Sequence, residues 1–198
     1  MTGTARGRRP GAPDTRAAVL AAARASFAER GFRGTTIRAV AATAGVDPAL
    51  VHHYFGTKDD LFLAAMELPV DPREVIAHVA SGPVEEVAER FLTAFLGVWD
   101  DPAIQPALLT VARRVLEPGG DRLLSEGFLP VVVQPVGALL GLDRPEHRMT
   151  LVASQVIGLI LMRYVLRVEP LASLPKEAVI ATYAPTLQRY LTGELPDP

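Results

Sequence analysis

The sequence predicts an all-α protein in two parts, with short helices near the N-terminus and a bundle of longer helices after them. Apolar residues recur at the three- and four-residue spacing of amphipathic helices, and no segment alternates apolar and polar residues as a strand does. Capping residues and glycines divide the first part into short segments, whereas prolines divide the second into longer ones. The 198 residues, 49% of them hydrophobic, are enough to form a substantial core.

Start and stop signals define the first two helices. The first begins near Asp14 and ends at Gly31, because glycine suits the left-handed conformation that follows many helices. Thr36 then lies where its side chain caps a short helix over 37–44, and Gly45 ends that helix.

Two further short helices follow. Asp47 and Pro48 provide the cap and the first helical position of a helix that runs to about Phe55. Thr57 caps a fourth helix, whose first turn carries two acidic residues beside the positive end of the helix dipole. The second and third helices, joined by a tight turn at 45–47, have the organisation of a helix-turn-helix.

The third helix has distinct inward and outward faces. Val51 and Phe55 share the inward face, whereas Ala49, Leu50 and His53 point away from it. The outward side is small or polar enough to enter a DNA major groove. There Ala49 and Leu50 offer apolar contact to a thymine methyl group, and His53 offers a hydrogen-bond donor or acceptor.

Charge is divided unevenly along the chain. Residues 1–58 contain nine basic and three acidic residues, whereas the remainder contains 11 basic and 19 acidic residues. This division is expected where only the front of a protein meets a polyanion, although an uneven spread of solvated charges is the alternative. We expect 1–12 to be a disordered basic arm, and Arg6, Arg8 and Arg9 either follow the DNA or have no binding role.

Several classes of site are excluded by composition. The chain has no cysteine, so it has no disulfide, no thiolate metal site and no cysteine nucleophile. It lacks the glycine loop ending in Lys-Ser/Thr and the His-Glu-x-x-His and Gly-x-Ser-x-Gly motifs. The adjacent His52 and His53 diverge by about 100° on a helix and have no third metal ligand at suitable spacing. We therefore expect no enzyme, no cofactor and no metal.

We expect a cytoplasmic protein that does not enter a membrane. The basic start of the chain is not followed by the apolar run of a signal peptide. The longest apolar stretch, 152–168, is interrupted by polar residues that include Arg163 and Arg167, which favours a buried helix over a membrane span.

The first part of the chain resembles the DNA-binding domain of the TetR family of transcriptional regulators. The resemblance covers about 13–70 and leaves 71–198 as a C-terminal helical domain that matches in architecture only. The residues that carry the resemblance are Gly31-Phe32, Thr35-Thr36, Ala41, Ala44-Gly45-Val46, Phe55, Lys58 and Leu61.

This resemblance implies a sequence-specific DNA-binding regulator, typically a ligand-responsive repressor that binds a palindromic double-stranded operator as a homodimer. It implies that Thr36 and Lys58 bind phosphates and that Arg38 reaches a base or a phosphate, although Thr36 as a cap and Lys58 as a solvated charge are the plainer alternatives. His52 stands where the family usually has tyrosine, so an imidazole would replace the phenol at a phosphate. The implied DNA-binding residues are Thr36, Arg38, Ala49, Leu50, His52, His53 and Lys58.

The C-terminal domain is expected to form dimers and to bind a ligand. Its predicted helices span 72–80, 83–99, 102–117, 121–140, 145–168 and 175–192, with kinks or breaks at Pro130, Pro135 and Pro185. The candidates for dimer contacts, which would serve equally in an intramolecular core, are Ala153, Ser154, Gly158, Val179, Ile180, Leu187 and Leu191.

The effector is expected to be small and hydrophobic or amphipathic, because the candidate helices are mostly apolar. A few polar groups interrupt them and either orient a ligand or serve structural roles, namely Arg113, Gln134, Gln155, Arg163 and Tyr164. A helical adaptor with only non-specific DNA attachment and, less favoured, a helical enzyme or carrier are the alternative functions.

Overall fold

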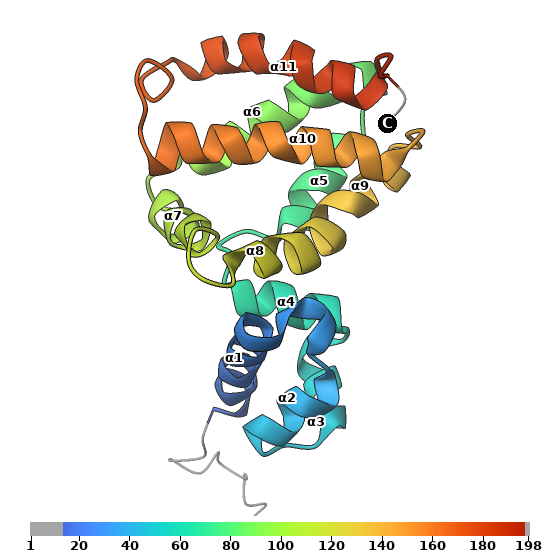
Figure 1. The fold of residues 1–198 in the computed structure, drawn as a ribbon, viewed down its shortest axis with the longest axis vertical. Coiled ribbons are helices and arrows are strands. Elements are labelled where there is room, and N and C mark those ends of the chain that lie inside the picture. The colour runs from blue at the N-terminus through green and yellow to red at the C-terminus, as the bar shows by residue number, and fades with distance from the viewer. Residues whose placement is uncertain (1–13, 197–198) are drawn as a thin grey trace, which may run out of the picture. The chain divides into compact units, whose positions relative to one another are not determined.

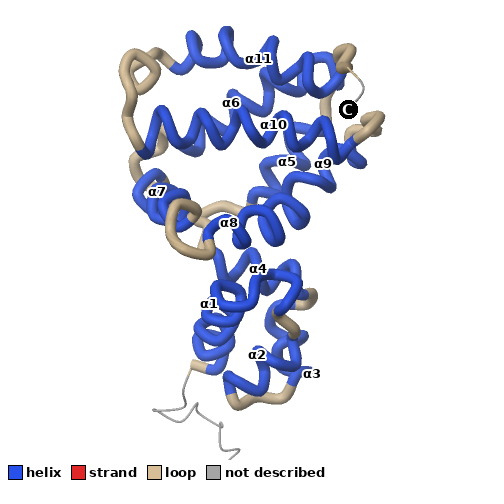
Figure 2. The backbone as a smooth tube through the Cα atoms, in the orientation of Figure 1, coloured by secondary structure: helices blue, strands red, loops and turns tan. Residues whose placement is uncertain are grey.

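The computed structural model describes residues 14–196, which form helices joined by loops and include no strand (Figures 1 and 2). The predicted all-α class is confirmed. The chain divides into two compact units, Met1–Met66 and Glu67–Pro198. The expected basic arm at 1–12 lies outside the described residues.

Residues 14–66 of the first unit form four helices, and α1 packs against two of the others. The long helix α1 packs against both α2 and α4, and α3 contacts α2 and α4. The helices are α1 (Thr15–Gly34), α2 (Ile37–Ala44), α3 (Pro48–Phe55) and α4 (Lys58–Met66).

Side-chain caps begin the first three helices where the sequence predicts them. The side chains of Asp14, Thr36 and Asp47 each accept a backbone N–H from the first turn of the following helix. The regular helix is interrupted at Gly31, where the sequence predicts its end. Gly31 has a φ of 70° and kinks the chain, and one further helical turn then runs to Gly34. The buried Thr35 hydroxyl holds that kink by donating to the Gly31 carbonyl at 2.9 Å.

An aromatic cluster holds α1 to α4. The ring of Phe62, 1% exposed, lies 5.2 Å from Phe27 and 5.3 Å from Phe32, both in edge-to-face geometry. Val40 from α2 and Val51 from α3 are fully buried in the same unit. The two short helices are therefore held by apolar packing, and their polar sides remain free.

The turn between α2 and α3 depends on a left-handed residue. Gly45 has φ 68° and ψ 32°, and a Cβ added there meets nothing within 4 Å. The cost of Gly45→Ala is therefore backbone strain alone, and we expect the free energy of unfolding to fall by about 1 kcal/mol. Asparagine, which tolerates this conformation, is expected to cost less.

Urea unfolding followed by circular dichroism measures these changes. Gly158→Ala is the matched control, because Gly158 lies in α10 (Pro145–Leu159) with open space around its Cβ position and without a positive φ. This control is expected to be neutral or stabilising. Equal stability of Gly45→Ala and the natural protein would show that the turn does not require the left-handed conformation.

The second unit is a bundle in which α6, α10 and α11 lie alongside one another (Figure 1). Its elements are α5 (Pro72–Ala80), the 3₁₀ turn η1 (Val84–Glu86), α6 (Val87–Trp99), α7 (Gln105–Arg114), α8 (Gly120–Arg122), the π-helical η2 (Leu123–Val133), α9 (Gln134–Leu139), α10 (Pro145–Leu159), the π-helical η3 (Ile160–Val165) and α11 (Lys176–Thr192).

Prolines alter the predicted 121–140 helix. Pro130 lies inside η2, where the backbone takes the wider π-helical turn, and the Gln134 N–H bonds to the Leu129 carbonyl five residues before it. Pro135 occupies the first turn of α9, where its missing N–H has no cost. The predicted break is therefore a change of helix type, because proline cannot donate the hydrogen bond of a regular α-helix.

Several candidate dimer residues belong to the intramolecular core. Val179 is fully buried, and Leu187 and Leu191 are at most 5% exposed. Ala153 is also buried. For these four the dimer prediction is wrong, because their surfaces are already covered by the chain's own helices. Ser154 on α10 is exposed.

One helix among the described residues, 145–165, is long and apolar enough by composition to cross a membrane. In the structure it packs Leu159 into the core of the second unit. Its Arg148 and Arg163 side chains are also buried there. The prediction of a buried helix over 152–168 holds only in part, because Met162 is exposed and the helix ends at Val165, before exposed Leu166 and Val168.

Candidate functional site

The outward face of α3 is accessible in the structure as its sequence predicts. Val51 is fully buried and Phe55 is 9% exposed, so this edge of the helix anchors it to the first unit. Ala49 and His53 are exposed on the other side, and Leu50 is half-buried. The face is narrow and carries no negative charge, as entry into a major groove requires.

The N-terminus of α2 presents Thr36 and Arg38. The Thr36 hydroxyl accepts the Ala39 N–H at 3.1 Å, which leaves its own O–H free to donate to a phosphate. The cap and the phosphate contact are therefore compatible. Arg38 is exposed and makes no hydrogen bond or ion pair with the residues that the structure describes. Its guanidinium is available to a base edge or a phosphate.

Lys58 begins α4 in a position that is poor for helix stability. A lysine in the first turn adds positive charge to the positive end of the dipole. Its Nζ lies 4.3 Å from the centroid of the Phe32 ring. Burial lowers the pKa of Lys58, and neighbouring Asp59 opposes that change. A cation held at a helix N-terminus is, by contrast, well placed for an anion such as a DNA phosphate.

His52 is oriented by the backbone at the end of α3. Its Nδ1 lies 2.8 Å from the Gly56 carbonyl oxygen, so Nδ1 carries the proton and donates. The exposed Nε2 is therefore an acceptor in the neutral ring and becomes a donor only when the ring is protonated. A direct bond from His52 to a phosphate requires the imidazolium form.

Tyr54 belongs to the same surface and was missed by the sequence analysis. Its side chain is 42% exposed, and its ring centroid lies 5.6 Å from that of His53. On the helical wheel Tyr54 falls beside Leu50, at the border of the outward face. That border position was the signal in the sequence, because a phenol there can donate to a phosphate.

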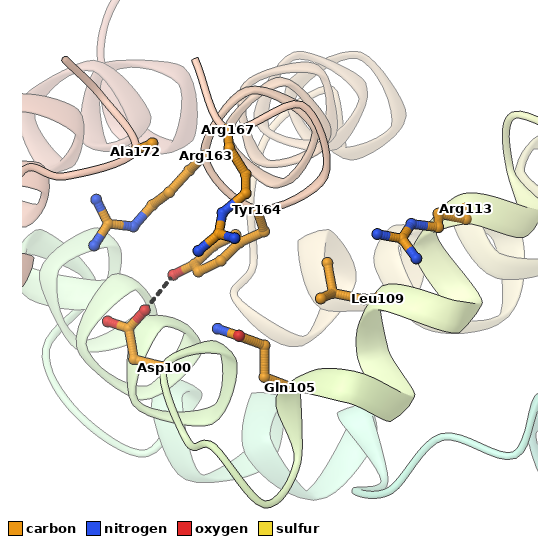
Figure 3. A pocket seen from close by; sticks show the side chains of 8 residues that line it. All are labelled: Asp100, Gln105, Leu109, Arg113, Arg163, Tyr164, Arg167 and Ala172. Carbon is orange, nitrogen blue, oxygen red and sulfur yellow. Dashed lines mark hydrogen bonds between the residues drawn. The ribbon is translucent and has the colours of Figure 1, made fainter. Parts of the chain in front are cut away.

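A cavity of about 200 Å³ lies in the second unit, among α6, α7, η3 and the loop after η3 (Figure 3). The Tyr164 hydroxyl donates to Asp100 Oδ1 at 2.9 Å, and its ring stacks on Trp99 with centroids 4.9 Å apart. Burial and the Asp100 carboxylate raise the pKa of Tyr164, so the phenol stays protonated. The lining residues are Asp100, Gln105, Leu109, Arg113, Arg163, Tyr164, Arg167 and Ala172.

This lining differs in part from the expected effector site. It includes Arg113, Arg163 and Tyr164 of the predicted polar residues but not Gln134 or Gln155. Most of its residues are polar, whereas the apolar helical runs favoured a hydrophobic wall. The sequence carried no signal for the remaining polar members, because a cavity depends on which helix faces meet.

Comparisons with known proteins follow the same division of the chain. Residues 19–65, which contain α2 and α3, match the family described as bacterial regulatory proteins, tetR family. Residues 85–191, more than half of the chain, match the tetracyclin repressor-like C-terminal domain. The chain belongs to the TetR family. The members of this family that the chain matches are described as regulatory proteins and not as enzymes.

Individual relatives of this TetR-family chain support the same family assignment. The HTH-type transcriptional regulator BetI of Brucella anthropi is 34% identical over 124 residues, 52% of this chain and 64% of that relative. BetI of Brucella canis is 46% identical over 81 residues, 38% of this chain and 40% of that relative. The matched region thus spans less than two thirds of these curated relatives. The crystal structure of a TetR-family regulator from Streptomyces coelicolor A3 is 41% identical, with a TM-score of 0.52, and the match covers 93% of this chain and 98% of that one.

The histidines and acidic residues of this TetR-family protein do not gather into a metal site within residues 14–196. No group of three or more such side chains there is placed to hold a metal ion.

Proposed function

We propose that this protein is a ligand-responsive repressor that binds a palindromic operator as a homodimer in the cytoplasm. The observation that carries the proposal is the surface formed by α3 and the N-terminus of α2. There, exposed Ala49, His53 and Arg38 lie on helices anchored by buried Val40 and Val51. A helix-turn-helix with a free outer face is the geometry by which such domains enter a major groove.

The proposed contacts divide into two kinds. Ala49, Leu50 and His53 meet base edges and supply specificity. Phosphates are held by Thr36, Arg38 and His52 of this surface and by Lys58 at the start of α4. The comparisons with relatives do not assign these residues. The support for Ala49 and Leu50 is their place on the outward face of α3, and the support for the others is the polar or charged group that each presents.

A dimer is required because two recognition helices must reach half-sites about 34 Å apart on one face of the duplex. Small exposed residues on α10 and α11 favour these helices as the interface. Ser154 is exposed on α10, and a Cβ at Gly158 meets nothing within 4 Å. On α11, Ala181 and Pro185 are exposed. Small residues of this kind let a second copy approach closely.

The effector is proposed to bind in the cavity of the second unit. A ligand changes operator affinity only if it binds one conformation more tightly than another. The conformation that it stabilises would hold the recognition helices at a spacing that no longer fits both half-sites. Effector titration against bound operator tests this step, since operator affinity that stays constant at saturation contradicts it.

Removing two basic residues tests the DNA surface itself. We expect Lys58→Ala combined with Arg38→Ala to weaken binding to a random-sequence duplex and to reduce its salt slope by about one to two phosphate equivalents. Fluorescence anisotropy at several salt concentrations measures the slope. Arg122→Ala is the control, because Arg122 is exposed on α8 of the second unit. An unchanged slope would remove Lys58 and Arg38 from the interface.

A further inference from the structure

We infer that the cavity of the second unit binds a small organic carboxylate through Arg113, Arg163 and Arg167. This inference rests on the proposed function, because it names the chemical class of the effector. Three guanidinium groups and a single carboxylate line the cavity, so its charge favours an anion.

The strongest evidence for an anion site comes from Arg163. Its side chain is buried, with 9% exposure, and it forms no ion pair with the described residues. Its Nη1 donates to the carbonyls of Leu171 and Leu174 at 2.7 and 2.9 Å, which fastens the loop after η3. Its buried Nε, however, has no hydrogen-bond partner. Asp100 is the one carboxylate in the same lining, and it forms no ion pair with Arg163. A buried guanidinium with an unused donor and no ion pair is costly, and a bound anion would relieve that cost.

Arg113 and Arg167 provide donors at the rim of the cavity. Both are exposed, and neither side chain makes a hydrogen bond with another described residue. Arg167 has a φ of 55°, which is strained for a residue other than glycine. Figure 3 shows the two side chains on separate segments, Arg113 on α7 and Arg167 just after η3, with Leu109 on the α7 side of the cavity. Guanidinium groups at such positions can hold a carboxylate from two sides.

The rest of the lining limits what kind of anion fits. Leu109, Ala172 and the Tyr164 ring offer apolar contact, which favours an organic ligand over inorganic phosphate. Asp100 opposes a second negative charge, and its Oδ1 is already bonded to Tyr164. At about 200 Å³ the cavity is below the range typical of drug-sized ligands. A small monocarboxylate with an apolar portion therefore suits the site.

Calorimetry on the full-length protein tests the assignment with matched probes. Butyrate, benzoate and 3-phenylpropionate are each compared with their neutral amides, and inorganic phosphate is included. We expect at least one carboxylate to bind with a Kd below about 1 mM and its amide to bind about tenfold or more weakly. The site is refuted if no carboxylate binds in that range, if amides bind equally well, or if phosphate binds most tightly.

Substitutions locate the binding. Arg113→Gln and Arg167→Gln are each expected to weaken the carboxylate about tenfold. Arg114→Gln makes the same change one residue along α7, outside the lining, and is expected to leave affinity unchanged. Thermal unfolding checks that the variants remain folded. The assignment would be refuted if both rim variants bound the carboxylate as tightly as the natural protein. It would also be refuted if the two rim variants and Arg114→Gln all lost affinity equally.

A separate operator assay distinguishes this inference from the proposed function. If a carboxylate binds as expected but operator affinity is unchanged at saturation, the anion site stands and the ligand switch fails. If a neutral compound changes operator affinity while every carboxylate fails to bind, the switch stands and the anion site fails.

Discussion

Glutamate in place of Ala49 is expected to abolish operator binding while the first unit stays folded. Ala49 is exposed in the first turn of α3, where a carboxylate is favourable for the helix dipole. In a major groove, however, the same carboxylate lies among DNA phosphates, and like-charge contacts cost several kcal/mol. We expect a loss of affinity of at least about 100-fold.

Fluorescence anisotropy measures this loss on a DNA fragment that the natural protein retains when it is mixed with genomic DNA. Circular dichroism checks the fold. Ala28→Glu is the matched control, because Ala28 is exposed on α1 of the same unit and lies outside the helix-turn-helix. The control is expected to bind within a few-fold of the natural protein. If Ala49→Glu also binds normally, α3 does not enter the groove.

Replacing Arg148 by methionine is expected to lower the free energy of unfolding by about 3 kcal/mol. Arg148 is 4% exposed, and its side chain joins the start of α10 to the end of α11. Its Nη1 donates to the Tyr190 and Gly193 carbonyls at 2.8 and 3.0 Å, and its Nε donates to Asp143 Oδ1 at 2.9 Å. Methionine fills similar space but leaves these acceptors without their donor.

Chemical denaturation measures the loss, with Arg122→Met as a control on an exposed arginine.

The same network predicts an acid dependence. Hydrogen bonding from Arg148 lowers the pKa of Asp143, so the ionised carboxylate stabilises the folded protein above the usual aspartate range. That contribution is lost as the pH falls through the lowered pKa. Stability of Arg148→Met should therefore decline less steeply below about pH 4 than that of the natural protein. A stable variant with an unchanged acid profile would show that the network contributes little.

Local signals made the helices of the first unit predictable. Thr36 and Asp47 cap helices through residues two or three positions away, and the periodicity of α3 alone identifies Val51 and Phe55 as its buried side. Such contacts lie within one helix, so the sequence contains them. The glycine at position 31 likewise marks the kink in α1, whereas the further turn to Gly34 had no such signal.

The second unit was less predictable because its contacts join distant segments. An apolar stripe does not reveal whether its partner is the same chain or a second copy, and Val179 and Leu187 proved to be intramolecular core. The cavity brings together Asp100 and Tyr164, 64 residues apart. Arg167 reaches its rim through a left-handed backbone that no helical pattern predicts.

Selection of DNA by the full-length protein tests the central claim of sequence-specific regulation most directly. Genomic fragments of its own organism are retained at near-physiological salt, recovered and sequenced. The account predicts enrichment of one palindrome, bound with an affinity in the nanomolar range. Retention without sequence preference that vanishes as salt rises would contradict it, because the basic front would then supply only electrostatic attachment, as in a helical adaptor.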